Sequence, residues 1–197
     1  TDVSPEIAIR DKIKLEPLAI ISLRNELRDN VIETVDFLQN NNVEVKVISG
    51  DNPKTVSYIA QKAGIANSDK YITGEELENL SKEEMIETVR EKVIFARVLP
   101  NQKEEIIDSL KSTGLHVGMV GDGVNDALSV KGSDLGIAMY DGAPATRRVA
   151  DLVLLNNSFA ALPQGIKIGN QIMQSIEMIA ILFFHKIILG VTILLTT

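Results

Sequence analysis

Short β-rich runs alternate with amphipathic helical segments along most of the chain, and this alternation constrains the fold more than any other feature. Residues 43–48 and 93–98 are β-rich, whereas residues 27–38 carry apolar side chains at helical spacing. Strands and helices that alternate at this length form βαβ units, in which helices cover both faces of a parallel sheet. We therefore expect an α/β fold with a Rossmann-like parallel sheet. The other expected strands are residues 18–23, 71–72, 116–120, 135–139 and 151–155.

Several of the expected helices begin and end at residues that favour helix termini. Asn and Ser side chains can accept hydrogen bonds from the free N–H groups of a first turn, and Gly favours a helix end. A Ser followed three residues later by Glu forms a capping box. The predicted termini are, in chain order, Asn52 with Pro53, Gly64, Ser81 with Glu84, Asn101 and Gly114.

The composition excludes several classes of function. The net charge is −7 and the pI is near 4.9, whereas a nucleic-acid partner requires clustered Lys and Arg. The chain contains no cysteine, which excludes a disulfide framework and a thiolate metal site and suits a cytosolic domain. Its first residue is Thr1, so we expect it to begin inside a longer gene.

The last part of the chain differs from the rest in its hydrophobicity. Residues 178–184 and 187–195 are nearly all apolar, and a membrane helix needs about 20 such residues. We expect a truncated membrane span here, with Lys186 snorkelling or facing a neighbouring helix. The alternative is a buried C-terminal helix. Residues 158–169 are the expected connector to this segment.

The run Gly121-Asp122-Gly123-Val124-Asn125-Asp126 is the strongest candidate site. Its glycines permit a tight turn, and its two carboxylates and one amide suit Mg²⁺ held beside a phosphate. Its residues do not fit an EF-hand, a Walker A loop or a dinucleotide fingerprint. The alternative for the loop alone is a polar turn ahead of a helix.

Two weaker features follow the preceding strands. Ser49-Gly50-Asp51 ends one strand and opens a helix, where a hydroxyl and backbone N–H groups can hold phosphate oxygens. Lys103, shortly after Arg97, could neutralise a transferring phosphoryl group. Taken singly, these are an ordinary helix cap and a surface lysine. In a parallel sheet, however, the carboxyl ends of strands share one edge, so we expect all three features to meet there.

Together the three features resemble motifs of the P-type cation-transporting ATPases. Ser49-Gly50-Asp51 resembles their Thr-Gly-Asp motif, and Arg97 to Lys103 resembles their Ala-Arg-Val-x-Pro-x-x-Lys segment. Gly121 to Asp126 matches their hinge motif, Gly-Asp-Gly-Val-Asn-Asp. The resemblance runs from about Leu15 to the end, and the motif order also resembles the wider haloacid dehalogenase superfamily. Matching downstream runs are residues 127–128, 135–139 and 150–155.

The resemblance implies a site that binds Mg²⁺, with ATP as substrate and a transported cation as cargo. Asp122 would be a Mg²⁺ ligand, with Asp126 supporting or sharing that role, and Arg97 would lie near nucleotide. The implied catalytic residues are Lys103, Asp51 and Asn125; the implied phosphate- or nucleotide-binding residues are Ser49, Gly50, Asp51, Arg97, Lys103 and Asn125; the implied metal ligands are Asp122 and Asp126.

The resemblance also implies a division of the chain and a location. Residues 1–158 would form an incomplete phosphorylation domain on the cytoplasmic side of a membrane, residues 159–175 a connector or stalk, and residues 176–197 a truncated fifth transmembrane helix. The identity of the transported ion stays open, because ion selectivity resides in membrane helices that lie mostly outside this chain.

Two departures from the family pattern matter. Ser49 replaces the usual Thr but keeps the hydroxyl, and the chain contains no Asp-Lys-Thr-Gly-Thr, the motif that supplies the phosphorylated Asp. We therefore expect a fragment of an ATP-driven pump that is inactive alone. The alternatives are a soluble haloacid-dehalogenase-type phosphatase fragment and a catalytically silent truncated protein.

Overall fold

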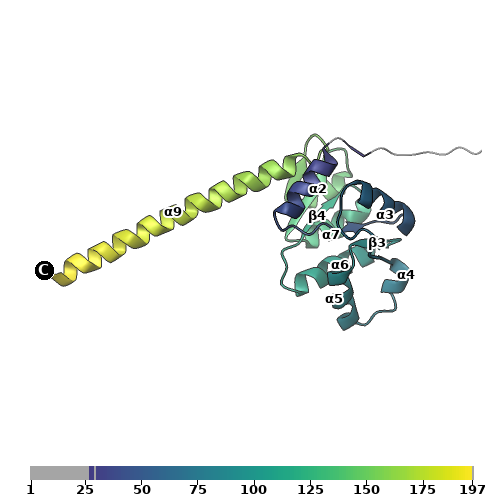
Figure 1. Cartoon of the computed structure of the whole chain (residues 1–197), viewed down its shortest axis with the longest axis horizontal. Coiled ribbons are helices and arrows are strands. Elements are labelled where there is room, and N and C mark those ends of the chain that lie inside the picture. Colours follow the sequence, from purple (N-terminus) through teal and green to yellow (C-terminus); the bar gives the residue numbers. More distant parts are fainter. Residues whose placement is uncertain (1–26, 29, 197) are drawn as a thin grey trace, which may run out of the picture.

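The computed structural model describes residues 27–28 and 30–196, and the strand expected at residues 18–23 lies outside them. Figure 1 shows an α/β body from which one long C-terminal helix projects. The helices are α2 (Val31–Asn40), α3 (Pro53–Lys62), α4 (Gly74–Leu77), α5 (Lys82–Glu91), α6 (Pro100–Ser112), α7 (Ala127–Gly132), α8 (Pro144–Val149) and α9 (Ala161–Thr196), with a 3-10 turn, η1 (Val124–Asp126). The strands are β1 (Val47–Ile48), β2 (Tyr71–Thr73), β3 (Ile94–Ala96), β4 (Gly118–Gly121), β5 (Leu135–Met139) and β6 (Leu152–Leu154).

The described strands form two parallel sheets where the sequence predicted one. The first has the order β1-β3-β2 and the second the order β4-β5-β6. All four strand pairs are parallel, as predicted. Ile48 of β1 and Val117, just before β4, pack against one buried cluster that includes Ile107 and Met119, so the two sheets share part of the core.

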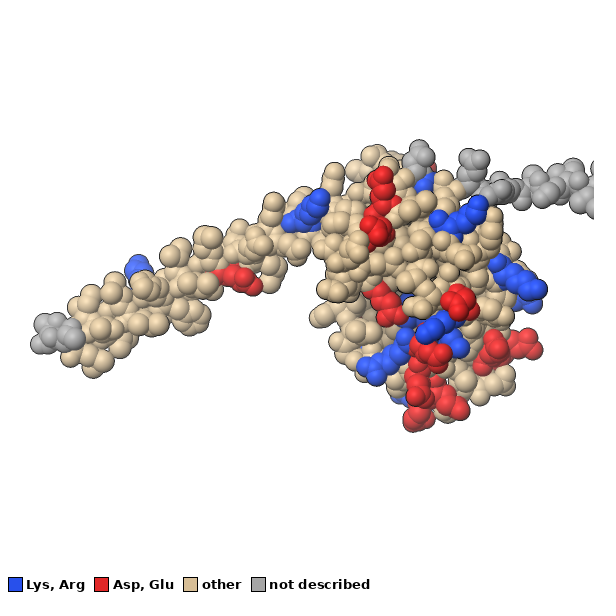
Figure 2. All heavy atoms as spheres, in the orientation of Figure 1, with Lys and Arg blue, Asp and Glu red and all other residues tan. Residues whose placement is uncertain are grey.

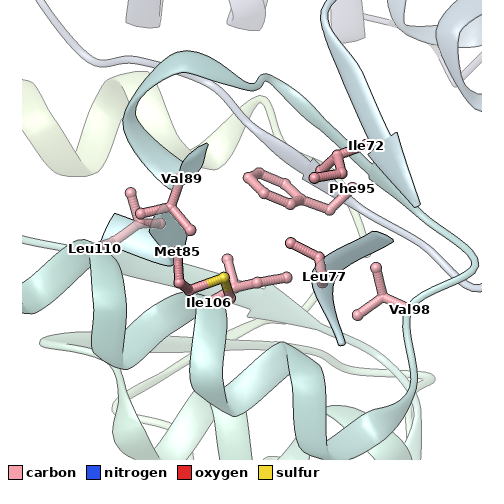
Figure 3. Close-up of a cluster of buried hydrophobic side chains, with 8 residues drawn as sticks. All are labelled: Ile72, Leu77, Met85, Val89, Phe95, Val98, Ile106 and Leu110. Carbon is pink, nitrogen blue, oxygen red and sulfur yellow. The ribbon is translucent and has the colours of Figure 1, made fainter. Parts of the chain in front are cut away.

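Helices cover both faces of the first sheet, which confirms the predicted layering. Successive side chains of a strand point to opposite faces, and β3 shows this clearly. Phe95 packs with α4, α5 and α6 in the cluster of Figure 3, while Ile94 and Ala96 pack against Val56 and Ala60 of α3 on the other face. The cluster in Figure 3 consists of Ile72, Leu77, Met85, Val89, Phe95, Val98, Ile106 and Leu110.

Two of the predicted helix starts are confirmed, and a third is wrong. Asn52 Oδ1 accepts a hydrogen bond from Lys54 N at 3.0 Å, and Ser81 and Glu84 form both bonds of a capping box. Asn101 does not cap α6, because Pro100 already occupies the first helical position.

The predicted strands at residues 43–48 and 93–98 are shortened most in the structure. The run 43–48 forms a strand only at Val47–Ile48, since Val43 N donates to Leu38 O and closes the end of α2 instead. The run 93–98 ends as a strand at Ala96, because Arg97 has φ 52 and turns the chain out of the sheet.

Helix α9 runs without a break through the predicted connector and the apolar segment, so residues 161–169 are helical. Its start contacts α2, where Lys167 Nζ lies 5.7 Å from the centre of the Phe37 ring. Beyond this contact its apolar side chains are exposed, and in Figure 2 the helix carries few charges compared with the body. Within the described part of the chain, it alone is long and apolar enough to cross a membrane, over Ala161–Ile193.

Candidate functional site

The turn Ser49-Gly50-Asp51 follows β1 and is hydrogen-bonded to the end of β3. Asp51 N donates to Ser49 Oγ at 3.1 Å, so the hydroxyl retained by Ser49 stabilises the turn itself. Arg97 N donates to Asp51 O, and Val98 N donates to Ser49 O, both at 3.1 Å. The first two predicted motifs are therefore joined through their backbones at the carboxyl edge of the first sheet. The side chains of Asp51 and Arg97 are exposed there.

Helix α6 begins immediately after this junction and carries Lys103 in its first turns. Its start depends on Gln102, a residue that the sequence analysis did not single out. Gln102 is 2% exposed; its Oε1 accepts from Leu99 N at 2.9 Å, and its Nε2 donates to Gly74 O at 2.8 Å. Gly74 leaves no room for a side chain, because an added Cβ would lie 2.4 Å from Arg97 O. Gln102 thus fixes where α6 begins and, with it, the position of Lys103.

Lys103 and Asp126 join the second and third predicted motifs. Lys103 Nζ lies 2.6 Å from Asp126 Oδ1, and the two side chains are 14% and 11% exposed. The second carboxylate oxygen of Asp126 accepts a hydrogen bond from Gly123 N at 3.1 Å. A single carboxylate therefore orients the lysine and closes the glycine-containing loop.

The Gly121–Asp126 loop turns tightly between β4 and α7. An added Cβ at Gly121 would lie 2.5 Å from Asp126 Cβ, so the loop needs glycine at that position. At Gly123, by contrast, an added Cβ would meet nothing closer than 3.4 Å. Asp122 and Asn125 are exposed. Within the described residues, neither side chain makes a hydrogen bond or ion pair.

The first turn of α8 and the residue before it also contact the loop, and the sequence analysis did not predict these contacts. Ala143 N donates to Asp122 O at 2.7 Å, and the Thr146 hydroxyl donates to Gly123 O at 2.6 Å. The sequence predicts a strand at residues 135–139, upstream of Thr146. Nothing in the local sequence, however, indicates that Thr146 contacts a loop 23 residues away.

The described residues offer few ligands for a metal ion. No group of three or more His, Asp or Glu side chains comes together among them. Because Asp126 is engaged by Lys103, the exposed carboxylate of Asp122 is the available ligand of the two predicted. A polar hollow of about 400 Å³ lies beside it, and its charged and polar lining also includes Arg28, Asp141 and Asn157. Mg²⁺ commonly takes one or two protein carboxylates and completes its shell with water and substrate phosphate, so a single protein carboxylate is compatible with Mg²⁺ at this position.

Comparison with known proteins identifies the family. Residues 2–134 match the haloacid dehalogenase-like hydrolases. The chain belongs to that family. It is 41% identical over 174 residues to the probable cation-transporting ATPase exp7 of Streptococcus pneumoniae, covering 88% of this chain and 22% of that protein. It is 39% identical over 186 residues to the calcium-transporting ATPase CtpE of Mycobacterium bovis, covering 92% of this chain and 22% of that protein.

Two solved structures that resemble this chain are also P-type ATPases or domains of them. A zinc-transporting PIB-type ATPase in the E2.Pi state superposes with a TM-score of 0.56 at 26% identity, covering 73% of this chain and 19% of that one. The catalytic domain of the CPx-ATPase CopB-B gives a TM-score of 0.55 at 26% identity, covering 71% and 45%. The predicted α/β fold and the resemblance to P-type cation-transporting ATPases are thereby confirmed. The chain spans about a fifth of the length of the curated relatives it matches.

Proposed function

We propose that this chain contributes the Mg²⁺- and phosphate-binding half of the phosphorylation site of a P-type ATPase, within an ATP-driven cation pump. The observation that carries the proposal is the Lys103–Asp126 ion pair at 2.6 Å, which brings two of the three motifs together beside the exposed Asp122. The relatives named above are cation-transporting ATPases, which supports a pump over a soluble phosphatase.

In the proposed mechanism, each residue acts on charge that develops during phosphoryl transfer from ATP to an aspartate outside this chain. Lys103 places a positive charge at the sheet edge, where it offsets negative charge on the phosphoryl oxygens. Ser49 and Gly50, in the turn after β1, and Asn125 donate hydrogen bonds to phosphate oxygens, while Asp51 and Arg97 flank the bound nucleotide. Asp122 is the metal ligand, and Asp126 supports the site by holding Lys103.

Mg²⁺ would neutralise phosphate charge at this site. Both carboxylate oxygens of Asp126 already accept hydrogen bonds, Oδ1 from Lys103 and Oδ2 from Gly123 N. Asp126 is therefore better suited to holding Lys103 and the loop in place than to binding Mg²⁺ directly.

Helix α9 supports the proposal that the protein is a membrane protein; by its resemblance to the pumps, this domain would lie on the cytoplasmic side. The apolar side chains of α9 are exposed, and the helix is long and apolar enough to cross a membrane over Ala161–Ile193, which favours a membrane protein over a soluble phosphatase. In the proposed pump, residues 1–158 belong to the phosphorylation domain, 159–175 form a stalk and 176–197 enter the membrane.

Titration calorimetry of the chain in detergent micelles tests the metal assignment. Asp122→Asn is expected to weaken Mg²⁺ binding by removing the charged ligand. The matched control is Asp108→Asn, which removes an exposed carboxylate on α6, toward the end of the helix away from Lys103. Equal Mg²⁺ affinity in the parent chain and Asp122→Asn would refute the assignment.

A further inference from the structure

Thr146 is a fully buried polar residue whose hydroxyl contacts the candidate site from outside the three motifs. It lies on α8, it is 0% exposed, and it donates to Gly123 O at 2.6 Å. A threonine in a helix commonly returns its hydroxyl to a carbonyl of the preceding turn. Here the bond goes to a segment 23 residues earlier in the chain, so it serves the loop and not its own helix.

The bond completes a set of contacts that fixes the backbone on both sides of the Asp122 side chain. Gly123 N donates to Asp126 Oδ2 at 3.1 Å, and Gly123 O accepts from Thr146, so both polar groups of Gly123 are bound. Asp122 O accepts from Ala143 N at 2.7 Å. With the backbone held in this way, the Asp122 carboxylate can reach only the positions that its side-chain rotamers allow.

Gly142 packs closely against the backbone of Asp122. An added Cβ at Gly142 would lie 2.7 Å from Asp122 O and 3.0 Å from Asp122 Cα. The Gly123 carbonyl also accepts from Asp126 N at 3.1 Å, so without the Thr146 hydroxyl it would keep that bond, lose the second of its two donors and face a buried methyl group. The loop then gains by moving its carbonyl toward water, and Asp122 moves with it.

We propose that Thr146 is a positioning residue for Asp122, which sets the affinity of the site for Mg²⁺ through the Gly123 carbonyl. The inference rests on the proposed function, because it takes Asp122 as the metal ligand. It adds a residue on α8 to the machinery that the motifs define, and it assigns to α8 a role beyond packing against β5 and α7.

The test uses the full chain in detergent micelles with Mn²⁺ as a paramagnetic probe and Mg²⁺ as competitor. Broadening of the amide signals of residues 121–126 reports Mn²⁺ at the loop, and displacement by Mg²⁺ gives the affinity. Thr146→Val removes the hydroxyl at nearly constant volume, and Thr146→Ser restores it. The matched control is Thr113→Val, since the Thr113 hydroxyl also donates at 2.6 Å, to Leu110 O at the end of α6.

The expected result is a loss of Mg²⁺ affinity of about three- to tenfold in Thr146→Val, the range that one buried hydrogen bond can supply. Thr146→Ser is expected to bind within about twofold of the parent chain, because the donor is present. Thr113→Val should bind Mg²⁺ like the parent chain even if its thermal midpoint falls as far as that of Thr146→Val.

Two results would overturn the inference while leaving the proposed function intact. One is unchanged affinity in Thr146→Val alongside weakened binding in Asp122→Asn. The other is equal loss in the Val and Ser variants, which would assign the effect to packing of the methyl group. If Asp122→Asn also binds as the parent chain does, the metal assignment itself fails, and the role of Thr146 fails with it.

Discussion

Removing one partner of the Lys103–Asp126 ion pair is expected to lower the free energy of unfolding. The charged atoms lie 2.6 Å apart, and the side chains are 14% and 11% exposed. Loss of one partner from a buried pair costs about 3–5 kcal/mol, because the remaining charge stays in a poorly solvated position. An exposed pair contributes only about 0–1 kcal/mol. With about a tenth of each side chain in water, we expect Lys103→Met to lose about 2–4 kcal/mol of unfolding free energy.

Urea unfolding of the chain in detergent micelles, followed by circular dichroism, measures this loss. The second single variant is Asp126→Asn, whose amide oxygen can still accept from Gly123 N. The double variant removes both charges, so it leaves no unpaired ion. We therefore expect it to be more stable than the sum of the single losses predicts, by about 1.5 kcal/mol or more.

A second ion pair in the same chain provides the control. Lys111 Nζ and Asp134 Oδ1 lie 3.3 Å apart, and both side chains are 34% exposed. The same cycle of Lys111→Met and Asp134→Asn is expected to give a coupling energy below about 1 kcal/mol. If the coupling of the Lys103–Asp126 pair does not exceed that of this exposed pair, the reasoning from burial is refuted.

Three further predictions concern the rest of the chain. The backbone N–H of Ser81, and after it the Ser81 hydroxyl, lowers the pKa of Glu84, so this carboxylate adds stability above its unfolded pKa that is lost as pH falls through the folded value. Ser81→Ala removes the hydroxyl and keeps the N–H, so it should raise the pKa of Glu84 part of the way in an NMR titration, and an unchanged pKa would contradict the contribution of the hydroxyl. Gly142→Ala should lower the free energy of unfolding in urea by about 1–3 kcal/mol, because the added methyl group crowds the backbone of Asp122. Stability equal to that of the parent chain would show that the backbone around Gly142 can shift to make room. Lys186→Leu should favour membrane insertion of α9 by about 3 kcal/mol in a translocon reporter assay, and equal insertion would place Lys186 at the interface.

Local signals allowed the sequence to predict the helices and the family motifs. The cap at Asn52 and the capping box at Ser81 need only residues within one turn, and both are present. The cap at Asn101 was wrong because α6 begins earlier, at Pro100, so Leu99 is the cap residue and Gln102 accepts the hydrogen bond from Leu99 N. Gln102 also bonds to Gly74, a partner that only the folded chain brings close.

The contacts that build the site depend on elements far apart in sequence, and these could not be predicted. The motif pattern placed Lys103 and Asp126 at one sheet edge, but it left open whether Asp126 binds metal or supports a neighbour. Packing of α6 beside η1 brings the lysine within 2.6 Å of that carboxylate. Thr146 gave no sequence signal, because a buried threonine on a short helix looks like any other core residue.

Under the proposed function, the two carboxylates of the hinge loop have different tasks, and the structure makes the difference testable. Asp126 holds Lys103 with one oxygen and the loop with the other, so it prepares both the positive charge and the backbone before any phosphate arrives. Groups oriented in advance need little reorganisation when charge develops, and this is where an active site gains most of its electrostatic effect. Replacing Asp126 should therefore disturb Lys103 and the loop together and lower stability. Replacing the exposed Asp122 should weaken metal binding and leave the fold as stable as before.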